Sequence, residues 1–289
     1  MGTLAARAEQ LLGRSVVATA PVPGGDTCTA TRLRLSDGRS ALMKTRPHSP
    51  PGFFAVEARG LGWLAEAHGA PVPEVLAVDD DCLVVAWVET GRATGEAAEQ
   101  LGRDLARTHA AGAARLGADT DGFIGSAPLP NTSADTWPDF YATCRVEPYL
   151  RVAVERQAIE PADVAAVNAL LDRLGELAGP AEPVARLHGD LWAGNLLWSA
   201  TDTVHVVDPA AHGGHRETDL AMLALFGAPH LDRVLEAYDE AAPLADGWRA
   251  RVPLHQLHPL LVHAARFGGS YGARAGSAAR AALEPRAHG

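Results

Sequence analysis

Three polar residues at fixed spacing constrain this chain more than any other feature. Asp190 and Asn195 belong to the segment His188-Gly-Asp-Leu-Trp-Ala-Gly-Asn195, and Asp208 follows after a short apolar run. The separation of Asp190 and Asn195 is that of the base and the metal-binding Asn in the kinase catalytic loop, and Asp208 falls where a second metal-binding Asp would lie. Packing does not explain polar residues spaced in this way within apolar sequence. The segment therefore predicts a fold built for metal-assisted phosphoryl transfer.

The N-terminal region has the pattern of a small antiparallel sheet. β-type runs alternate with the turn signals Pro23-Gly-Gly-Asp26 and Ser36-Asp-Gly-Arg39. One segment with helical periodicity lies between the third and fourth of these runs. Strands are expected at Ser15–Thr19, Cys28–Leu35, Ala41–Thr45, Val75–Val78 and Cys82–Val88, with a helix at Phe53–His68. This order predicts a bilobal α+β fold of the protein-kinase type, with residues 1–88 as its nucleotide-binding lobe.

From residue 89 the sequence becomes Ala-rich with helical periods, which predicts a larger, mostly helical lobe for catalysis and acceptor binding over residues 89–289. The boundary is expected near residues 86–91. The expected helices are Ala93–Ala111, Thr136–Arg156, Pro161–Leu177, Asp219–Phe226, His230–Ala241 and Asp246–Phe267, with short strands at Leu196–Ser199 and Val204–Asp208. The Ala-, Arg- and Gly-rich tail from Gly272 is expected to be loosely held at its end.

Composition restricts the class of protein. The formal net charge of −10 argues against binding to nucleic acid or to an anionic membrane, because both depend on clustered Lys and Arg. It does not exclude ATP, since local basic residues, metal ions and backbone N–H groups hold phosphates in acidic proteins. No run reaches the roughly 18 apolar residues of a membrane span or resembles a signal peptide. Three widely separated cysteines form no disulfide or zinc pattern, so a cytoplasmic, thiol-reduced protein is expected.

Candidate phosphate-binding residues lie in the first lobe. The chain has no G-x-x-x-x-G-K-[ST] loop and no G-x-G-x-x-G at the start of a helix. Gly24 and Gly25 instead lie between two strands, where backbone N–H groups can approach phosphate, although an ordinary hairpin turn is the competing interpretation. Lys44 ends a strand and Glu57 lies in the next helix, as in the Lys–Glu pair of kinases. The alternative for this pair is a surface Lys and a solvated Glu.

The motif residues have distinct chemical roles in this interpretation. Asp190 is the candidate general base, which accepts the proton of the attacking hydroxyl or orients that hydroxyl toward the γ-phosphate. Asn195 and Asp208 offer hard oxygen ligands suited to Mg2+. His188 is expected to order the loop rather than to react.

Further candidates surround the loop. Trp192 can stack on a sugar or an apolar substituent, and core packing is the alternative. Glu217 and Asp219 lie at the start of a predicted helix, where they either line the substrate site or cap the helix. The nearby histidines fit no zinc spacing and are expected at the surface and in loops: His205, His212 and His215.

The chain resembles a known family in these motifs and over nearly its whole length. His188-Gly-Asp-Leu-Trp-Ala-Gly-Asn195, Asp208-Pro-Ala210 and Gly214-His-Arg-Glu-Thr-Asp-Leu-Ala-Met222 are similar to the fructosamine kinase (ketosamine-3-kinase) family. That family shares the protein-kinase-like fold with the aminoglycoside and choline kinases, from which the Trp in the loop separates it. Two C-terminal motifs, Leu225-Phe-Gly227 and Phe267-Gly-Gly-Ser-Tyr271, also resemble the family pattern.

The resemblance implies an ATP-dependent kinase that transfers the γ-phosphate to the 3-hydroxyl of a ketosamine, the Amadori sugar on a glycated amine. The 3-phosphate then eliminates, which frees the amine. Lys44 and Glu57 would hold phosphates, and the other motif residues would act as described above. The resemblance also implies that adenine binds to the backbone of Ala86, Trp87 and Val88.

The sequence departs from the family pattern at several positions. Asp26 occupies the position of the family's Cys after the glycine turn, which puts redox regulation through Cys28 in doubt. Ala86 replaces the usual Glu of the hinge, and His255 and His258 stand where aromatic residues are common. None of these changes affects the residues expected to transfer phosphate.

Two other functions are compatible with the sequence. A phosphotransferase of the aminoglycoside or choline type keeps the same fold, and the negative net charge suits its cationic acceptor. A non-catalytic nucleotide-binding pseudokinase is disfavoured, because such proteins typically lose at least one phosphoryl-transfer residue. The preferred ketose, the choice between a free amino acid and a protein lysine, and the oligomeric state have no signal in the sequence.

Overall fold

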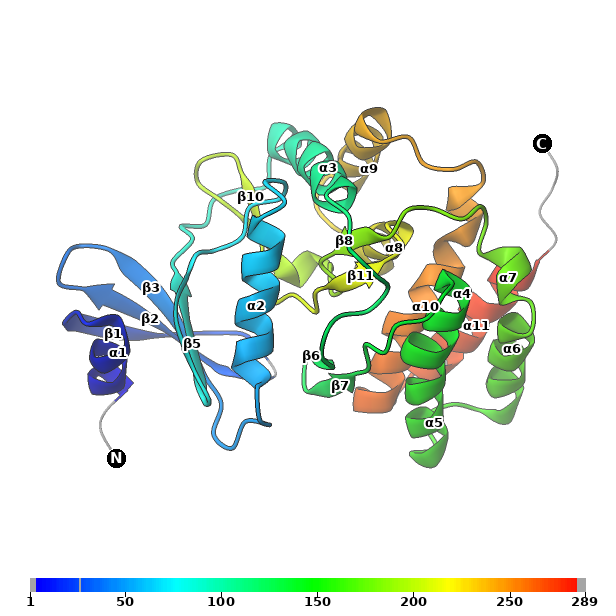
Figure 1. The fold of residues 1–289 in the computed structure, drawn as a ribbon, viewed down its shortest axis with the longest axis horizontal. Coiled ribbons are helices and arrows are strands. Elements are labelled where there is room, and N and C mark those ends of the chain that lie inside the picture. The colour runs from blue at the N-terminus through cyan, green and yellow to red at the C-terminus, as the bar shows by residue number, and fades with distance from the viewer. Residues whose placement is uncertain (1–3, 26, 285–289) are drawn as a thin grey trace.

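The N-terminal part of the computed structural model is a five-stranded antiparallel sheet (Figure 1). The structure describes residues 4–25 and 27–284, so Asp26 lies outside the described part. In spatial order the strands are β1 (Val16–Val22), β2 (Thr29–Leu35), β3 (Ser40–Thr45), β5 (Cys82–Ala86) and β4 (Val75–Asp79). Two helices pack on this sheet, α1 (Leu4–Leu12) and α2 (Phe53–Ala65). The sequence predicted α2 and the strands, but not α1.

Alternation along β3 assigns the two faces of the sheet to different helices. Met43 is buried in one cluster with Ala8 of α1. Leu42 packs in a second cluster, which contains Phe54 of α2. Because successive strand side chains point to opposite faces, Lys44 falls on the α2 side. The period of the strand thus directs Lys44 toward α2.

The rest of the chain is mainly helical. After β5, the segment 87–94 leads to α3 (Gly95–Ala110), which packs against α9 (Leu231–Ala241). The largest core is formed by α5 (Glu147–Glu155), α6 (Pro161–Leu171), α7 (Leu174–Leu177), α10 (Trp248–Phe267) and α11 (Tyr271–Leu283). Helix α8 (Glu217–Phe226) packs on α10. Within the described residues, no helix combines the length and the apolar character needed to cross a bilayer.

Short strand pairs frame the motif region. β8 (Ala185–Leu187) pairs with β11 (His212–Gly214), and β9 (Leu196–Trp198) pairs with β10 (Val204–Val206). The loop between β8 and β9 ends in a 3-10 turn at Ala193–Asn195, and Asp208 follows β10. The N–H of Val207 donates to the carbonyl of Asn195 at 3.0 Å. This contact holds the end of the loop beside the residue that precedes Asp208.

Two predicted helices are divided in the structure. The segment predicted as Thr136–Arg156 consists of α4 (Trp137–Phe140), a π-helical turn (Tyr141–Val146) and α5. Pro148, which has no N–H to donate, lies in the first turn of α5, directly after the π-helical turn. The segment predicted as Pro161–Leu177 is similarly divided into α6 and α7.

The C-terminal tail forms a packed helix that the sequence did not predict. Ala275 and Ala279 of α11 are fully buried. A Cβ at Gly276 would lie 2.0 Å from Asp163 Oδ1, and a Cβ at Gly272 would lie 2.0 Å from the Ala158 carbonyl oxygen. Small residues therefore let α11 approach α6 closely. Residues 285–289, where the tail was expected to be loosely held, lie outside the described part.

Candidate active site

A cleft of about 880 Å³ lies between the sheet and the helical region. Its lining includes these residues singled out from the sequence: Gly24, Gly25, Lys44, Glu57, Asp190, Trp192, Asn195 and Asp208. Within the described part of the chain, the lining does not include the other candidates, Ala86, Trp87, Val88, Glu217 and Asp219. The structure thus brings together the residues expected to transfer phosphate and separates Glu217 and Asp219 from them.

Lys44 joins two carboxylates in the cleft. Its Nζ lies 2.5 Å from Glu57 Oε1 and 2.6 Å from Asp208 Oδ1. Burial alone would lower the pKa of Lys44, but the two carboxylates outweigh burial and hold this pKa above its ordinary value. The side chains of Lys44 and Glu57 are only 11% and 14% exposed, so the interpretation as solvated surface residues does not hold. A charged amine is therefore fixed at the floor of the cleft.

Asp190 and Asn195 face each other across the loop of residues 188–195 between β8 and β9, here called the motif loop. The Nδ2 of Asn195 donates to the backbone carbonyl of Asp190 at 2.8 Å and lies 3.3 Å from its Oδ2. Burial, together with the nearby charge of Asp208, raises the pKa of Asp190 to about 7. A carboxylate with a raised pKa is a stronger proton acceptor than an ordinary Asp. Because Nδ2 is used within the loop, the amide oxygen is the atom of Asn195 left to bind a cation.

Asp208 has an unusual backbone conformation. Its φ is 56°, in the left-handed region that residues other than glycine rarely adopt. Asp adopts this region more readily than most residues, and five other described non-glycine residues outside the cleft lining share it, so the conformation by itself does not mark a functional site. The side chain is 49% exposed and borders the cleft. Together with the amide oxygen of Asn195, its carboxylate forms an all-oxygen donor set, which fits Mg2+ rather than a softer ion.

The turn between β1 and β2 requires its glycines. Gly24 and Gly25 have φ values of 107° and 85°, which disfavour any side chain. Both glycines and Thr27 line the cleft. The turn therefore presents backbone to the cleft, in addition to joining two strands.

Asp219 holds the motif loop from beneath. Its carboxylate accepts the N–H groups of His188 at 2.7 Å and Gly189 at 2.9 Å. His109 Nε2 lies 3.2 Å from the same carboxylate, and the other ring nitrogen of His109 is 2.8 Å from the Tyr238 hydroxyl. Asp219 is only 1% exposed, so it supports the loop and lies out of reach of a substrate. His109 and Tyr238 were missed because neither belongs to a motif near the loop in sequence.

The first residues of the loop have structural roles. His188 Nε2 lies 2.9 Å from the carbonyl oxygen of Val207, so this ring ties the loop to the strand segment before Asp208. Gly189 has a φ of 82°, and a Cβ there would lie 2.2 Å from the Ala210 carbonyl oxygen. The ordering role expected for His188 agrees with these contacts.

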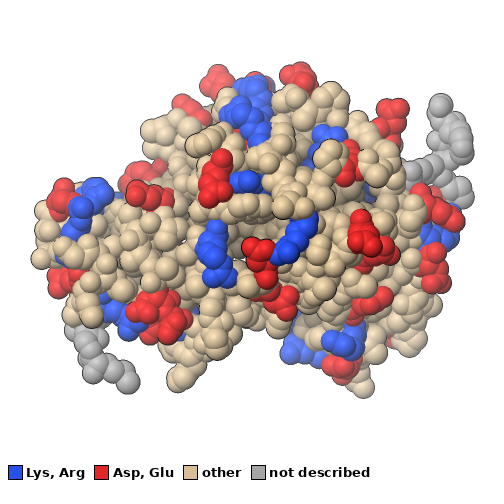
Figure 2. All heavy atoms as spheres, viewed as in Figure 1, with Lys and Arg blue, Asp and Glu red and all other residues tan. Residues whose placement is uncertain are grey.

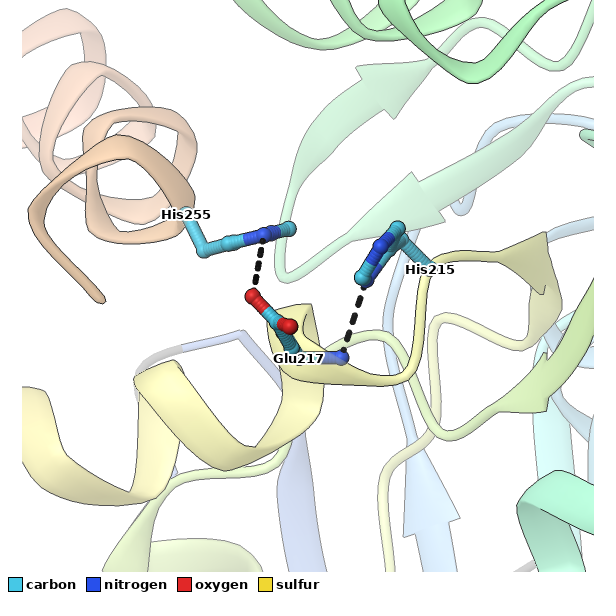
Figure 3. A group of neighbouring side chains, drawn as sticks. All are labelled: His215, Glu217 and His255. Atoms are coloured by element: carbon cyan, nitrogen blue, oxygen red, sulfur yellow. Dashed lines mark hydrogen bonds and ion pairs between the residues drawn. The ribbon is translucent and has the colours of Figure 1, made fainter. Parts of the chain in front are cut away.

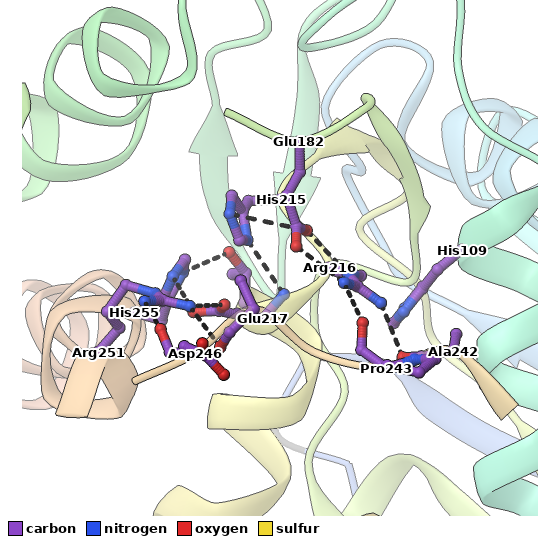
Figure 4. Close-up of polar contacts among 12 residues, drawn as sticks. His109, Glu182, His215, Arg216, Glu217, Ala242, Pro243, Asp246, Arg251 and His255 are labelled. Atoms are coloured by element: carbon purple, nitrogen blue, oxygen red, sulfur yellow. Dashed lines mark hydrogen bonds and ion pairs between the residues drawn. The ribbon is translucent and has the colours of Figure 1, made fainter. Parts of the chain in front are cut away.

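Glu217 belongs to a buried network of charged and aromatic side chains (Figure 4). Arg251 donates to its two carboxylate oxygens at 2.8 and 2.5 Å, and His255 Nε2 lies 3.3 Å from Oε2. His215 Nδ1 accepts the backbone N–H of Glu217 at 3.2 Å. Glu217 is 3% exposed. These contacts explain its acidic side chain without a substrate.

His215, Glu217 and His255 have the composition of a metal site, with ligand atoms within 4.8 Å of one another (Figure 3). Two contacts oppose that interpretation. Arg251 occupies the carboxylate, and the Nδ1 of His215 accepts an N–H, which leaves the ring proton on Nε2. The cluster is therefore a structural network. The expectation of surface histidines is wrong for His212 and His215, which are 4% and 6% exposed.

The last residue of β5 and the residue that follows it use their N–H groups within the protein. Ala86 donates to the Glu74 carbonyl at 2.8 Å, and Trp87 donates to the Ser40 carbonyl at 3.2 Å. These two groups are therefore not available to a bound base. The adjacent cleft wall is apolar and includes Ala30, Leu42, Val85 and Leu197.

An aromatic surface lies beside Asp190. The indole of Trp192 is 40% exposed and covers Gly194, where a Cβ would meet its ring at 2.2 Å. Its ring meets that of Phe226 edge-on, with centroids 6.1 Å apart. The cleft lining continues with His263, Phe267 and Tyr271. Four of these lining residues were not predicted as site residues: Phe226, His263, Phe267 and Tyr271. Three of them, Phe226, Phe267 and Tyr271, nevertheless lie in the C-terminal motifs noted in the sequence.

The fold and the site together define a phosphotransferase with a protein-kinase-like fold. The same fold is found in a spectinomycin phosphotransferase and in a choline kinase of Streptococcus pneumoniae, with TM-scores of 0.56 and 0.58 at 12% and 16% identity. A lobe with an antiparallel sheet, a helical lobe and a cleft between them is the architecture predicted from the sequence.

The chain belongs to the fructosamine kinase family, whose model matches residues 3–284. The structure of a candidate fructosamine-3-kinase from Thermobifida fusca superposes with a TM-score of 0.93 at 52% identity, covering 97% of this chain and 98% of that one. A probable ketoamine kinase of Thermus thermophilus is 38% identical over 87% of this chain and 88% of its own length. The chloroplastic protein-ribulosamine 3-kinase of Arabidopsis thaliana is 31% identical over 86% and 77%. The chain is thus a ketosamine kinase.

Proposed function

We propose that the protein transfers the γ-phosphate of ATP to the 3-hydroxyl of a ketosamine, and that loss of the 3-phosphate then frees the glycated amine. One observation carries the phosphoryl-transfer step. Asp190, with its pKa raised to about 7, lies in one cleft with the oxygen ligands Asn195 and Asp208 and the fixed amine of Lys44. The 3-hydroxyl is supported by the names of two relatives, a fructosamine-3-kinase and a ribulosamine 3-kinase.

Each residue of the cleft has a role in this proposal. Asp190 takes the proton of the attacking hydroxyl as the new P–O bond forms. Lys44, held by Glu57, binds donor phosphates. Asn195 and Asp208 would hold Mg2+, which would neutralise phosphate charge when bound. Asp208 contacts Lys44 in this structure. In this proposal the two side chains separate when Lys44 binds phosphate and Asp208 binds Mg2+.

Adenine fits the apolar pocket between Leu42, Val85 and Leu197. The N–H groups of Ala86 and Trp87 are already bonded within the protein. We therefore assign adenine recognition to the carbonyl groups of this segment and to the backbone of Val88. The family resemblance implied contacts of adenine with the backbone of all three residues 86–88, and this assignment leaves out the N–H groups of Ala86 and Trp87.

The acceptor end of the cleft favours a neutral or anionic acceptor over a polycation. Its described acidic lining residues are Glu57, Asp190 and Asp208, all engaged in phosphoryl transfer, whereas the aromatic side carries Arg266. Aminoglycosides carry several cationic groups and need negative charge from the acceptor site. A sugar can instead stack on the exposed indole of Trp192.

Replacing Lys44 with Met is expected to weaken ATP binding by about tenfold or more, because a charge-assisted contact to phosphate is lost. Isothermal titration with Mg·ATP measures the change. Arg34→Met, on the exposed part of β2, is the control and should leave the Kd unchanged. An unaltered Kd in Lys44→Met would contradict the phosphate-binding role.

ADP release with Mg·ATP tests the proposed function directly. The acceptor panel is fructosyl-lysine, ribulosyl-lysine, choline and kanamycin, and the released amine is followed in parallel. We expect turnover of one or both ketosamines, followed by amine release. Turnover of choline or kanamycin alone would replace the ketosamine assignment by that of another hydroxyl acceptor. ATP binding without turnover of any acceptor would support a binding-only role.

A further inference from the structure

Arg266, in the last turn of α10, reaches across the cleft to the glycine turn. Its Nη2 lies 3.5 Å from the hydroxyl oxygen of Thr27, at the end of the turn between β1 and β2. The guanidinium stacks on the ring of Phe267 at 4.6 Å. Asp190 lines the same cleft. Arg266 therefore contacts the glycine turn within the cleft that also holds the candidate base.

Gly125 makes room for this guanidinium. It joins β6 (Gly122–Ile124) to β7 (Ala127–Leu129) and has a φ of 55°. A Cβ at this position would lie 2.2 Å from Arg266 Nη1 and 2.7 Å from its Cζ. Both residues line the cleft. The backbone of the hairpin is thus shaped around the position that Arg266 occupies.

We propose that Arg266 is a further catalytic residue, which binds the transferring phosphoryl group between the glycine turn and Asp190. This inference rests on the proposed function. The donor's γ-phosphate must lie beneath the turn that covers the phosphates and in line with the hydroxyl that Asp190 activates. Arg266 is the residue on the helical side whose guanidinium contacts that turn.

The chemical role is stabilisation of charge. The bond between the γ-phosphorus and the ADP oxygen breaks, a bond to the acceptor oxygen forms, and the acceptor proton passes to Asp190. During this transfer negative charge spreads over the three equatorial oxygens. A planar guanidinium donates to two of these oxygens together, which a single amine cannot do in the same geometry. Lys44 is held by Glu57 on the opposite side of the cleft, so Arg266 supplies a separate positive charge.

Nucleotide binding tests the contact without any acceptor. Arg266→Leu is expected to weaken binding of a non-hydrolysable ATP analogue by about tenfold or more, while ADP binding stays unchanged. Retained ADP binding also shows that the variant folds. Equal loss for ATP analogue and ADP, or no loss for either, would overturn the proposal. This result does not depend on which acceptor the enzyme uses, so it separates failure of the proposal from failure of the ketosamine assignment.

An anion beside Arg266 is either the transferring phosphoryl group or a carboxylate of the acceptor, and kinetics with two ketosamines separates these two cases. The first ketosamine is the fructosyl derivative of a free amino acid, which carries a carboxylate. The second is the fructosyl derivative of a neutral alkylamine, which carries none. We expect Arg266→Leu to lower kcat by about a hundredfold or more with both, in the range known for phosphoryl-stabilising arginines. A rise in KM restricted to the carboxylate-bearing acceptor would instead identify Arg266 as an acceptor-binding residue and overturn the proposal.

Two further variants control for local disturbance. Arg274 does not belong to the described cleft lining, although its guanidinium lies over the rings of Phe226 and Tyr271, which do. Arg274→Leu should therefore change kcat little. Gly125→Ala should lower kcat by displacing Arg266, and should have little further effect in the Arg266→Leu background. Full additivity of these two substitutions would contradict a role for Gly125 in positioning Arg266.

Discussion

Asp190→Asn is expected to lower kcat by about a thousandfold or more while leaving ATP binding and the fold intact. General-base catalysis contributes about 10²- to 10⁴-fold, and an amide cannot take the proton of the hydroxyl. The substitution is nearly isosteric. The strongest contact of Asn195, to the backbone carbonyl of residue 190 at 2.8 Å, does not depend on the side chain that is changed. The loop should therefore keep its shape.

The measurement is ADP release with the best ketosamine, accompanied by thermal unfolding and ATP titration of the same samples. Asp119→Asn is the matched control, because its side chain is 95% exposed and lies outside the described cleft lining. This control should retain full activity. Activity of Asp190→Asn within a few-fold of the wild-type value would remove Asp190 from the mechanism. A loss of activity that accompanies unfolding would assign the residue a structural role instead.

The candidate catalytic residues, which the structure places in one cleft, could be singled out because their signal is local. Asp190, Asn195 and Asp208 lie within 19 residues of chain, and their spacing reflects one loop and one short hairpin. Lys44 and Glu57 were accessible for a similar reason, since strand alternation fixes the face of the lysine and the next helix packs on that face. Such patterns need no knowledge of the tertiary structure.

Residues whose roles depend on distant partners could not be assigned in the same way. Asp219 resembled a cap or a substrate contact, but its partners His188 and His109 lie 31 and 110 positions away in sequence. Helix α11 has an Ala- and Gly-rich face that gives no clear apolar period, and it becomes a buried face only against α6 and α10. The same limitation explains the buried histidines, whose burial depends on rings contributed by Trp137 and other distant residues.

Arg251→Met is expected to lower the free energy of unfolding by about 3–5 kcal/mol, because it leaves the carboxylate of Glu217 buried without its cation. Both side chains of this pair are nearly inaccessible, at 1% and 3% exposed. Urea unfolding followed by circular dichroism measures the change. Arg173→Met, which removes an exposed pair with Glu176, should cost less than about 1 kcal/mol. A cost for Arg251→Met no larger than this control would show that the pair contributes little to stability.

The pH dependence of the same pair gives a second, independent test. Burial would raise the pKa of Glu217, but His255 and Arg251 outweigh it and lower this pKa from its ordinary value of 4.5 to about 2. The unfolded chain therefore binds the proton first as the pH falls, so the stabilisation is complete above about pH 4.5 and is lost progressively as the pH falls toward 2. Glu217→Gln lacks this titration, and its stability should fall less steeply with acid than that of the wild type. Parallel acid profiles for the two proteins would mean that Glu217 keeps its ordinary pKa in the folded state, and that the geometry of the pair is not accompanied by the expected electrostatic stabilisation.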